Sequence, residues 1–380
     1  MNKVWDQPGS AERARHRSHM SRRELLGLLG AGAGLGLASA VRGDPGAAAE
    51  PLQTVQPAGA VAFPEGAVIR TVLKDVSPAT LGMAATLFHE HLSFEWARVR
   101  PPNGRGDLTG PAKDVALLSG QLDIAAAEGV GCIVDAGTTD VGRDVAFLAR
   151  IAAQTRVHIV ACGGLYMQRT YPPDLAARSE DQIADDLVRD AVANRYGAFG
   201  EIGETPDAAM SADERKVFRA VGKAHLRTNL PIFTHNAYGT GPNVPRDAGL
   251  RQLEAFESAG VNPRQIAIGH TCCLDDPTAD IIKQLAKKGA FVGFDRVTGG
   301  AVPDDKKVRM ILAFLEAGYA DHLLLSSDYN FTARSAARPG YGTTLTVFVP
   351  KLREAGVKED TIRRVTVDNP RRFLAFVPKP

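Results

Sequence analysis

Four histidines and one aspartate directly follow short apolar runs, and imidazole nitrogens with carboxylate oxygens are a donor set typical of divalent metal sites. These residues are His89, His91, His235, His270 and Asp328. His89 and His91 are two positions apart, so on an extended strand both imidazoles point to one face and can reach one ion. Each of the other three alone is more typical of a hydrogen-bonded strand end or a helix cap. Only a fold that brings these run ends together would turn the set into a metal site.

Eight apolar runs recur along the chain, and each is followed by a helical pattern. The runs end near His91, Ala136, Gly163, Glu201, His235, His270, Asp295 and Asp328. Their spacing of 25 to 45 residues is that of a strand and helix unit. Eight such units predict a closed (β/α)8 TIM barrel, of the α/β class, over residues 61–380. In such barrels the chemistry lies at the carboxyl ends of the strands, which would bring the candidate ligands to one mouth.

Helix signals stand between the runs. Ser179 with Gln182, and Ser211 with Glu214, match the capping box that satisfies the first backbone N–H groups of a helix. Apolar residues then recur at helical spacing, at Ile183 and Leu187, at Val217 and Val221, and at Val308, Ile311, Leu312 and Leu315. The alternation of strand and helix favours the barrel over an all-β fold.

The composition indicates a globular protein and excludes several other classes. Of the 380 residues, 44% are hydrophobic and 23% are charged, which excludes a disordered or collagen-like chain. The whole chain has 45 Lys and Arg against 43 Asp and Glu, so we expect no nucleic-acid partner, which would require a strongly basic domain. Four cysteines in this length do not make a disulfide framework, and stability must come from a large core.

Residues 1–40 resemble a twin-arginine export signal. Arg22 and Arg23 precede an apolar run over residues 25–40, whose end Ala38-Ser39-Ala40 matches an A-x-A cleavage site. The alternative is an N-terminal membrane anchor, for which this glycine-rich run is short. Residues 41–60, rich in Ala, Pro and Gly, are expected to form a flexible linker. We therefore expect export by the twin-arginine machinery and a periplasmic or secreted mature protein.

In the order and spacing of its motifs the chain resembles the phosphotriesterase-like branch of the amidohydrolase superfamily, from about Val68 to Phe376. The matching motifs are Phe88-His89-Glu90-His91-Leu92, Thr234-His235, Gly269-His270, Ser326-Ser327-Asp328 and the closing run Asp368-Asn369-Pro370-Arg371-Arg372-Phe373-Leu374. The resemblance implies two divalent ions at the strand ends. It assigns His89, His91 and Asp328 to the more buried ion, and His235 and His270 to the more exposed one.

The group that bridges the two ions departs from the modified lysine of many family members. Residues 197–204 contain no lysine, and Glu201 occupies the matching position, as in a glutamate-bridged sub-branch. Because glutamate is shorter than the modified lysine, a weaker or differently shaped second site is predicted. Glu204 is the alternative bridge, but its i+3 position turns it to the opposite face of a continuing strand.

The resemblance implies a hydrolase. Two ions, for which the donor set favours zinc, lower the pKa of a bridging water, so that hydroxide attacks a carbonyl carbon or a phosphorus and Asp328 accepts the proton. The expected substrates are lactones, carboxyl esters or phosphotriesters. An amidohydrolase that cuts C–N bonds is the enzymatic alternative, and an exported metal-binding protein without catalysis is the non-enzymatic one.

Two residues are candidate substrate contacts. Tyr166 matches an aromatic residue that lies near the metals in relatives. Arg296 belongs to an Asp-Arg pair that resembles lactonase-like members, although Val297 stands where those often carry tyrosine. A core tyrosine and a surface ion pair are equally good interpretations. The family resemblance also implies a homodimer, and the pair Cys272-Cys273 is expected to pack near the sixth strand.

Overall fold

The computed structural model describes residues 61–95, 98, 113–205, 209–236, 245–331 and 340–379. The predicted export signal and linker, residues 1–60, lie outside the described residues and stay predictions. Among the helices of the described residues, none is both long enough and apolar enough to cross a membrane.

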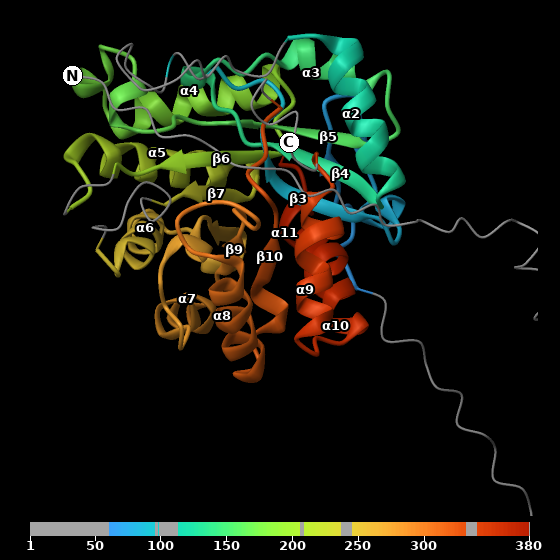
Figure 1. The fold of residues 1–380 in the computed structure, drawn as a ribbon. Helices are drawn as coiled ribbons and strands as arrows, with labels where there is room; N and C mark the ends of the chain where they lie inside the picture. The colour runs from blue at the N-terminus through green and yellow to red at the C-terminus, as the bar shows by residue number, and fades with distance from the viewer. Residues whose placement is uncertain are drawn as a thin grey trace, which may run out of the picture. The chain divides into compact units, whose positions relative to one another are not determined.

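Eight parallel strands form the predicted (β/α)8 barrel, and the helices lie around them (Figure 1). In chain order the strands are β3 (Ala85–Glu90), β4 (Val130–Asp135), β5 (His158–Gly163), β6 (Ala198–Gly203), β7 (Ile232–His235), β8 (Ile266–Ile268), β9 (Phe291–Phe294) and β10 (Leu323–Leu325). Each strand pairs with the next, from β3 to β10. The ring closes just past the strand ends, where the Asp328 N–H donates to the His89 carbonyl at 3.2 Å and the His91 N–H donates to the Tyr329 carbonyl at 2.9 Å.

The helices follow the strands as the sequence predicts. They are α2 (Val115–Ala127), α3 (Val145–Ala152), α4 (Glu180–Ala193), α5 (Ala212–Thr228), α6 (Ala248–Glu257), α7 (Asp280–Lys288), α8 (Asp304–Glu316), α9 (Val349–Glu354), α10 (Glu359–Arg363) and α11 (Asn369–Leu374). Both predicted capping boxes are present: Ser179 caps α4 with Gln182, and Ser211 caps α5 with Glu214. The capping pattern was therefore a reliable guide to where these two helices begin.

Apolar side chains fill the barrel interior. They include Phe88, Val134, Val160, Phe233, Ala267, Leu324 and, from α11, Phe373 and Leu374. The Phe88 ring meets Phe233 and Phe373 edge-on, with centroids 6.2 Å and 6.3 Å apart. Because this interior holds no room for solvated groups, the polar side chains of the strands gather at the mouth.

A short antiparallel hairpin and a terminal bridge join the two ends of the barrel domain. The hairpin consists of β1 (Ile69–Arg70) and β2 (Asp75–Val76). Beside it, Val68 and Phe376 exchange backbone hydrogen bonds of 2.8 Å and 3.0 Å. The segment after α11 is thus fixed against the segment that precedes the first barrel strand.

The close packing at the start of β6 leads to a stability prediction. A Cβ on Gly197 would lie 2.4 Å from the Arg70 carbonyl oxygen and 2.5 Å from Val160 Cγ1. We expect Gly197→Ala to lower the stability by about 1–3 kcal/mol through overpacking. Gly120, inside α2, has no atom within 4 Å of such a Cβ, so Gly120→Ala should stabilise by about 0.5–1 kcal/mol. Thermal unfolding followed by circular dichroism measures both, and a Gly197→Ala protein that melts at or above the wild-type temperature would contradict the packing argument.

Candidate metal centre

The six predicted ligand side chains lie together at the carboxyl ends of the strands. They are His89 and His91 at β3, Glu201 in β6, His235 in β7, His270 after β8 and Asp328 after β10. Potential ligand atoms of His89, Glu201 and His270 lie within 4.8 Å of one another, and those of His89, His91 and Asp328 form a second such group. Five of the six residues are buried, and the Asp328 side chain is 15% exposed, which makes it the donor most open to the mouth.

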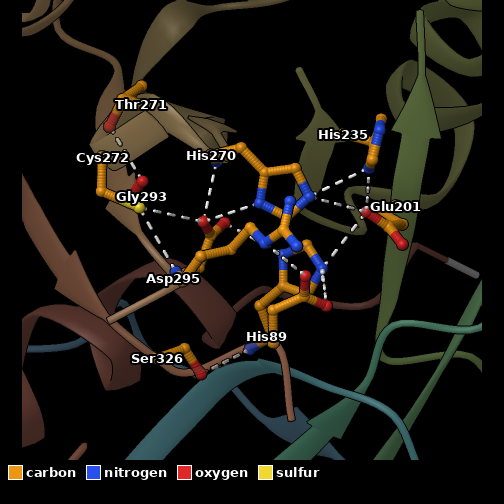
Figure 2. Close-up of polar contacts among 12 residues, drawn as sticks. His89, Glu201, His235, His270, Thr271, Cys272, Gly293, Asp295 and Ser326 are labelled. Carbon is orange, nitrogen blue, oxygen red and sulfur yellow. Dashed lines mark hydrogen bonds and ion pairs between the residues drawn. The ribbon is translucent and has the colours of Figure 1, made fainter. Parts of the chain in front are cut away.

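Glu201 contacts all four histidines, and Figure 2 shows it facing His235 and His270. Its Oε2 lies 2.9 Å from His235 Nδ1, 3.2 Å from His89 Nε2 and 3.5 Å from His270 Nε2. Its Oε1 lies 3.4 Å from His91 Nε2. The two-methylene arm of glutamate is therefore long enough to reach the donors expected for both ions.

Glu204, the alternative bridge, lies away from this cluster. Its carboxylate accepts hydrogen bonds from Arg251 at 2.9 Å and from Gln252 at 3.2 Å. The same Gln252 amide donates to the His235 carbonyl at 3.0 Å. Glu204 thus supports the backbone of β7 from the outside, as its i+3 position predicts.

The Asp328 carboxylate completes the group at β3. Its Oδ1 lies 2.9 Å from His91 Nε2 and 3.8 Å from His89 Nε2. The backbone of Asp328 has a φ of 50°, in the left-handed region that residues other than glycine seldom adopt. Such strain at a cluster of polar side chains is typical of functional sites, where the surrounding structure fixes the conformation.

Asp295, at the end of β9, orients one histidine of each group. Its Oδ2 lies 3.0 Å from His89 Nδ1, and its Oδ1 lies 2.9 Å from His270 Nδ1 (Figure 2). Oδ1 also accepts the backbone N–H of His270 at 2.8 Å, which holds that residue at a φ of 52°. From the sequence, Asp295 is expected at the end of an apolar run and beside the candidate substrate contact Arg296, without an orienting role. The available signal for this orienting role was a carboxylate at the end of the seventh apolar run.

Glu90, the middle residue of the His-Glu-His motif, fixes the segment that carries Asp328. Its carboxylate accepts hydrogen bonds from Ser326 Oγ at 2.7 Å, from the Ser327 N–H at 2.9 Å and from the Tyr329 N–H at 2.6 Å. Burial raises the pKa of Glu90 to about 7, against the effect of these donors. No sequence signal indicates this role beyond the presence of Glu90 between the two histidines.

Burial and nearby carboxylates shift the pKa values of the histidines in opposite directions. Burial disfavours a charged His270, but the Asp295 carboxylate outweighs burial and raises the pKa of His270 to about 10. For His235 burial prevails over the attraction of Glu201 and lowers the pKa to about 4. Burial also opposes ionisation of Glu201, yet the nearby His89 and His235 hold its pKa well below the usual range. The cluster therefore requires positive charge, supplied either by protons on imidazoles or by bound cations.

The donor set fits divalent ions. Nδ1 of His91 is buried and has no hydrogen-bond partner among the described residues, and Nε2 of His89 faces only carboxylate oxygens, those of Glu201 at 3.2 Å and Asp328 at 3.8 Å. Nε2 of His270 and Nδ1 of His235 face each other at 2.9 Å, an arrangement that needs a proton or a cation between two lone pairs. An unpaired buried polar atom costs about 1–3 kcal/mol, which ion binding would offset. His89, His91 and Asp328 would hold one ion, His235 and His270 a second, and Glu201 would reach both.

Tyr166 and Arg296 border this cluster. The Tyr166 Oη lies 3.0 Å from His235 Nδ1, and the Arg296 Nε lies 3.1 Å from Asp328 Oδ2. Tyr166 is buried, whereas the Arg296 side chain is 28% exposed. Their position next to predicted ligands is established by the structure, and their contact with a substrate stays a prediction. Cys272 and Cys273 are buried just after β8, the sixth barrel strand, where the sequence predicts them to pack.

Proton release on metal binding follows from the charge state of His270. With a pKa of about 10, His270 is protonated near neutral pH in the metal-free protein, and an ion at its Nε2 must displace that proton. We expect about one proton or more released per chain on zinc binding, and an apparent zinc affinity that rises about tenfold per pH unit below pH 10. Calorimetry in buffers of different ionisation enthalpy gives the proton count.

Two variants test whether His270 is the source of the released proton. Asp295→Asn removes the charge that raises the pKa of His270, so fewer protons should be released. His158→Gln alters a half-buried histidine at the start of β5 and should leave the count unchanged. A wild-type count near zero at neutral pH would show that His270 is not the protonated group.

The chain is similar to known hydrolases over nearly all of the barrel. The model of the phosphotriesterase family matches residues 67–374. An aryldialkylphosphatase of Saccharolobus solfataricus is 31% identical over 308 residues, which cover 76% of this chain and 94% of that protein. An N-acetyltaurine hydrolase of Bos taurus is 26% identical over 356 residues, with 81% and 98% covered.

A solved structure shows the same architecture. The crystal structure of the phosphotriesterase homology protein from Escherichia coli, complexed with phosphate in its active site, superimposes with a TM-score of 0.69 at 26% identity. The match covers 79% of this chain and all of that chain. Together with the eight-stranded barrel and the cluster of histidines and carboxylates at its mouth, these similarities establish that the chain belongs to the phosphotriesterase family.

Proposed function

We propose that this protein is a metal-dependent hydrolase of ester-type bonds, with a lactone, carboxyl ester or phosphotriester as substrate. The observation that carries the proposal is the position of Glu201, whose carboxylate lies within 3.5 Å of histidine nitrogens from both predicted ion positions. Two bound divalent ions, which we propose are zinc, would activate water and polarise the scissile C=O or P=O bond. A binding protein without catalysis would not need a bridging carboxylate of this kind.

Asp328 is the residue placed to accept the proton of the attacking water. It is the most exposed of the six donors, and its Oδ2 faces Arg296 while Oδ1 faces His91. Burial alone would raise the pKa of Asp328, but His91 and Arg296 outweigh it and lower the pKa. The carboxylate is therefore ionised and ready to take up a proton at neutral pH.

The same charge environment supports an ester over an amide substrate. An amine leaving group has to be protonated as it departs, whereas a phenoxide, alkoxide or ring-opened lactone oxygen needs less help from an acid. Because its pKa is low, Asp328 is ionised at neutral pH and carries no proton for an amine leaving group until it has taken one from water. Cleavage of C–N bonds is the second candidate function, because the similar N-acetyltaurine hydrolase bears the name of an amide-cleaving enzyme.

A buried apolar cluster packs beside the donors. Phe94, Tyr166 and Met167 form one buried cluster with Val141. The Phe94 ring lies 4.8 Å from the His91 ring and 6.3 Å from the Tyr166 ring. These four side chains are buried, so they pack against the rings of the predicted ligands and fix them on this side of the donor cluster.

The first test compares matched substrates in the wild type and in Asp328→Asn. We expect a higher kcat/KM for 4-nitrophenyl acetate and alkyl lactones than for the corresponding amides, including 4-nitroacetanilide. Loss of the proton acceptor should lower kcat by about 10²- to 10⁴-fold in protein brought to the wild-type zinc content with added zinc, since Asp328 is also a predicted metal ligand. Faster turnover of the amides would replace the ester proposal by the C–N hydrolase. Equal rates for the two proteins would support a metal-binding protein without catalysis.

The second test measures the metal content directly. We expect about two zinc equivalents per wild-type chain, and a loss of about one or more in Glu201→Gln, which keeps the shape but removes the bridging charge. Glu204→Gln is the matched control, since this buried carboxylate of the same strand end contacts Arg251 and Gln252 instead. Elemental analysis of protein dialysed against zinc gives the counts. Two retained equivalents in Glu201→Gln would rule out the bridging role.

A further inference from the structure

Lys307 is a completely buried lysine in the first turns of α8, and its ammonium group is directed at the loop after β9. Its Nζ donates to the Arg296 carbonyl at 2.8 Å, to the Gly299 carbonyl at 2.5 Å and to Asp304 Oδ1 at 3.3 Å. All three ammonium protons therefore have an oxygen acceptor, as a buried charge requires. Two of these acceptors are backbone groups of the loop that begins with Arg296.

Asp304, the first residue of α8, also binds the backbone of this loop. Its Oδ1 accepts the Thr298 N–H at 2.9 Å, and its Oδ2 accepts from Lys351 Nζ at 2.6 Å. Of the three oxygen partners of Lys307 only Asp304 carries a charge, and Asp304 shares that charge with Lys351. Burial of an ammonium whose one charged partner is shared is costly even when its hydrogen bonds are satisfied, and an apolar side chain would serve a purely structural position as well.

Arg296 is held on both sides of its backbone. Its N–H donates to Cys272 Sγ at 3.3 Å, and its carbonyl accepts from Lys307. The next residue, Val297, donates its N–H to the Ser326 carbonyl at 3.4 Å. The Lys307 bond thus fixes the point from which the Arg296 side chain extends to Asp328 at 3.1 Å.

From this chain of contacts we infer that Lys307 is a positioning residue for Arg296 and so determines how well the site binds the anionic or polarised oxygens of a substrate. The inference rests on the proposed function and on the predicted contact of Arg296 with the substrate. Lys307 does not touch the substrate itself. Displacement of a positioned charge by about 1 Å can cost about 100-fold in activity, so loss of the Lys307 bonds should be measurable.

The experiment is a double-mutant comparison on the zinc-loaded protein. Lys307→Met and Arg296→Met should each raise KM for 4-nitrophenyl acetate or for the best lactone by about tenfold or more, with a smaller effect on kcat. The double variant should be no worse than Arg296→Met, because Lys307 acts through Arg296. Lys351→Met removes another ammonium from the same Asp304, without contact to Arg296, and should keep the wild-type KM.

A second measurement does not depend on turnover. Titration of the zinc-loaded proteins with inorganic phosphate should give a Kd about tenfold weaker in Lys307→Met and in Arg296→Met, and unchanged in Lys351→Met. If Lys307→Met folds poorly, Lys307→Gln keeps an amide donor and should show the same pattern with a smaller loss of Tm.

The outcomes separate the two proposals. A wild-type KM and phosphate Kd in Lys307→Met, or equal losses from Lys307→Met with and without Arg296, would overturn the positioning role. A wild-type KM and phosphate Kd in Arg296→Met would overturn it as well, because Lys307 could then not act on binding through Arg296. If the wild type hydrolyses no substrate of the panel, the proposed function fails, and the phosphate titration still decides the role of Lys307.

Discussion

The carboxylate of Glu201, buried among four imidazoles, is the constraint on which the rest of the structure depends. A carboxylate removed from water costs several kcal/mol unless positive charge and hydrogen bonds surround it. The side chain is only 2% exposed and has histidine nitrogens on both oxygens. Its burial is possible because three strand ends, those of β3, β7 and β8, bring four imidazoles to one point, and that convergence in turn requires a closed ring of strands. The charge balance at the mouth therefore depends on barrel closure, because only the closed ring brings the imidazoles to Glu201.

Two further carboxylates keep this arrangement rigid. Asp295 joins histidines from β3 and β8, and Glu90 joins β3 to the segment after β10. Each makes hydrogen bonds across the barrel mouth, where the backbone ladder has already ended. They also hold His270 and Asp328 in left-handed backbone conformations, which would otherwise relax. The apolar interior beneath, closed by α11, excludes water from below and strengthens each of these electrostatic contacts.

Much of this could be predicted from the sequence, because periodicity and strand-end chemistry are local signals. All eight strands end within three residues of the predicted run ends, and the six predicted ligands lie in one cluster. The roles of Asp295 and Glu90 could not be predicted, because each depends on a partner far away in the chain, and the contacts of Lys307 depend on the path of the loop after β9. Simple alternation also fails at the centre. Phe88 lies in the apolar interior and His89 in the polar cluster, and the pairing of β3 with β4 shifts register between Leu87 and Glu90. Such irregularities re-aim side chains near active sites and leave no clear pattern in the sequence.

The barrel joins the earliest and the latest segments of its domain, with a consequence for biosynthesis. The His89 N–H bonds to Ser326 Oγ, 237 positions later, and the bridge of Val68 to Phe376 spans still more of the chain. During translation the histidines of β3 emerge from the ribosome long before Asp328 does. A nascent chain therefore carries His89 and His91 long before the last of the six donors is made, and its ring of strands stays open until β10 has been synthesised. Complete ion binding would have to wait for that strand and for Asp328 after it.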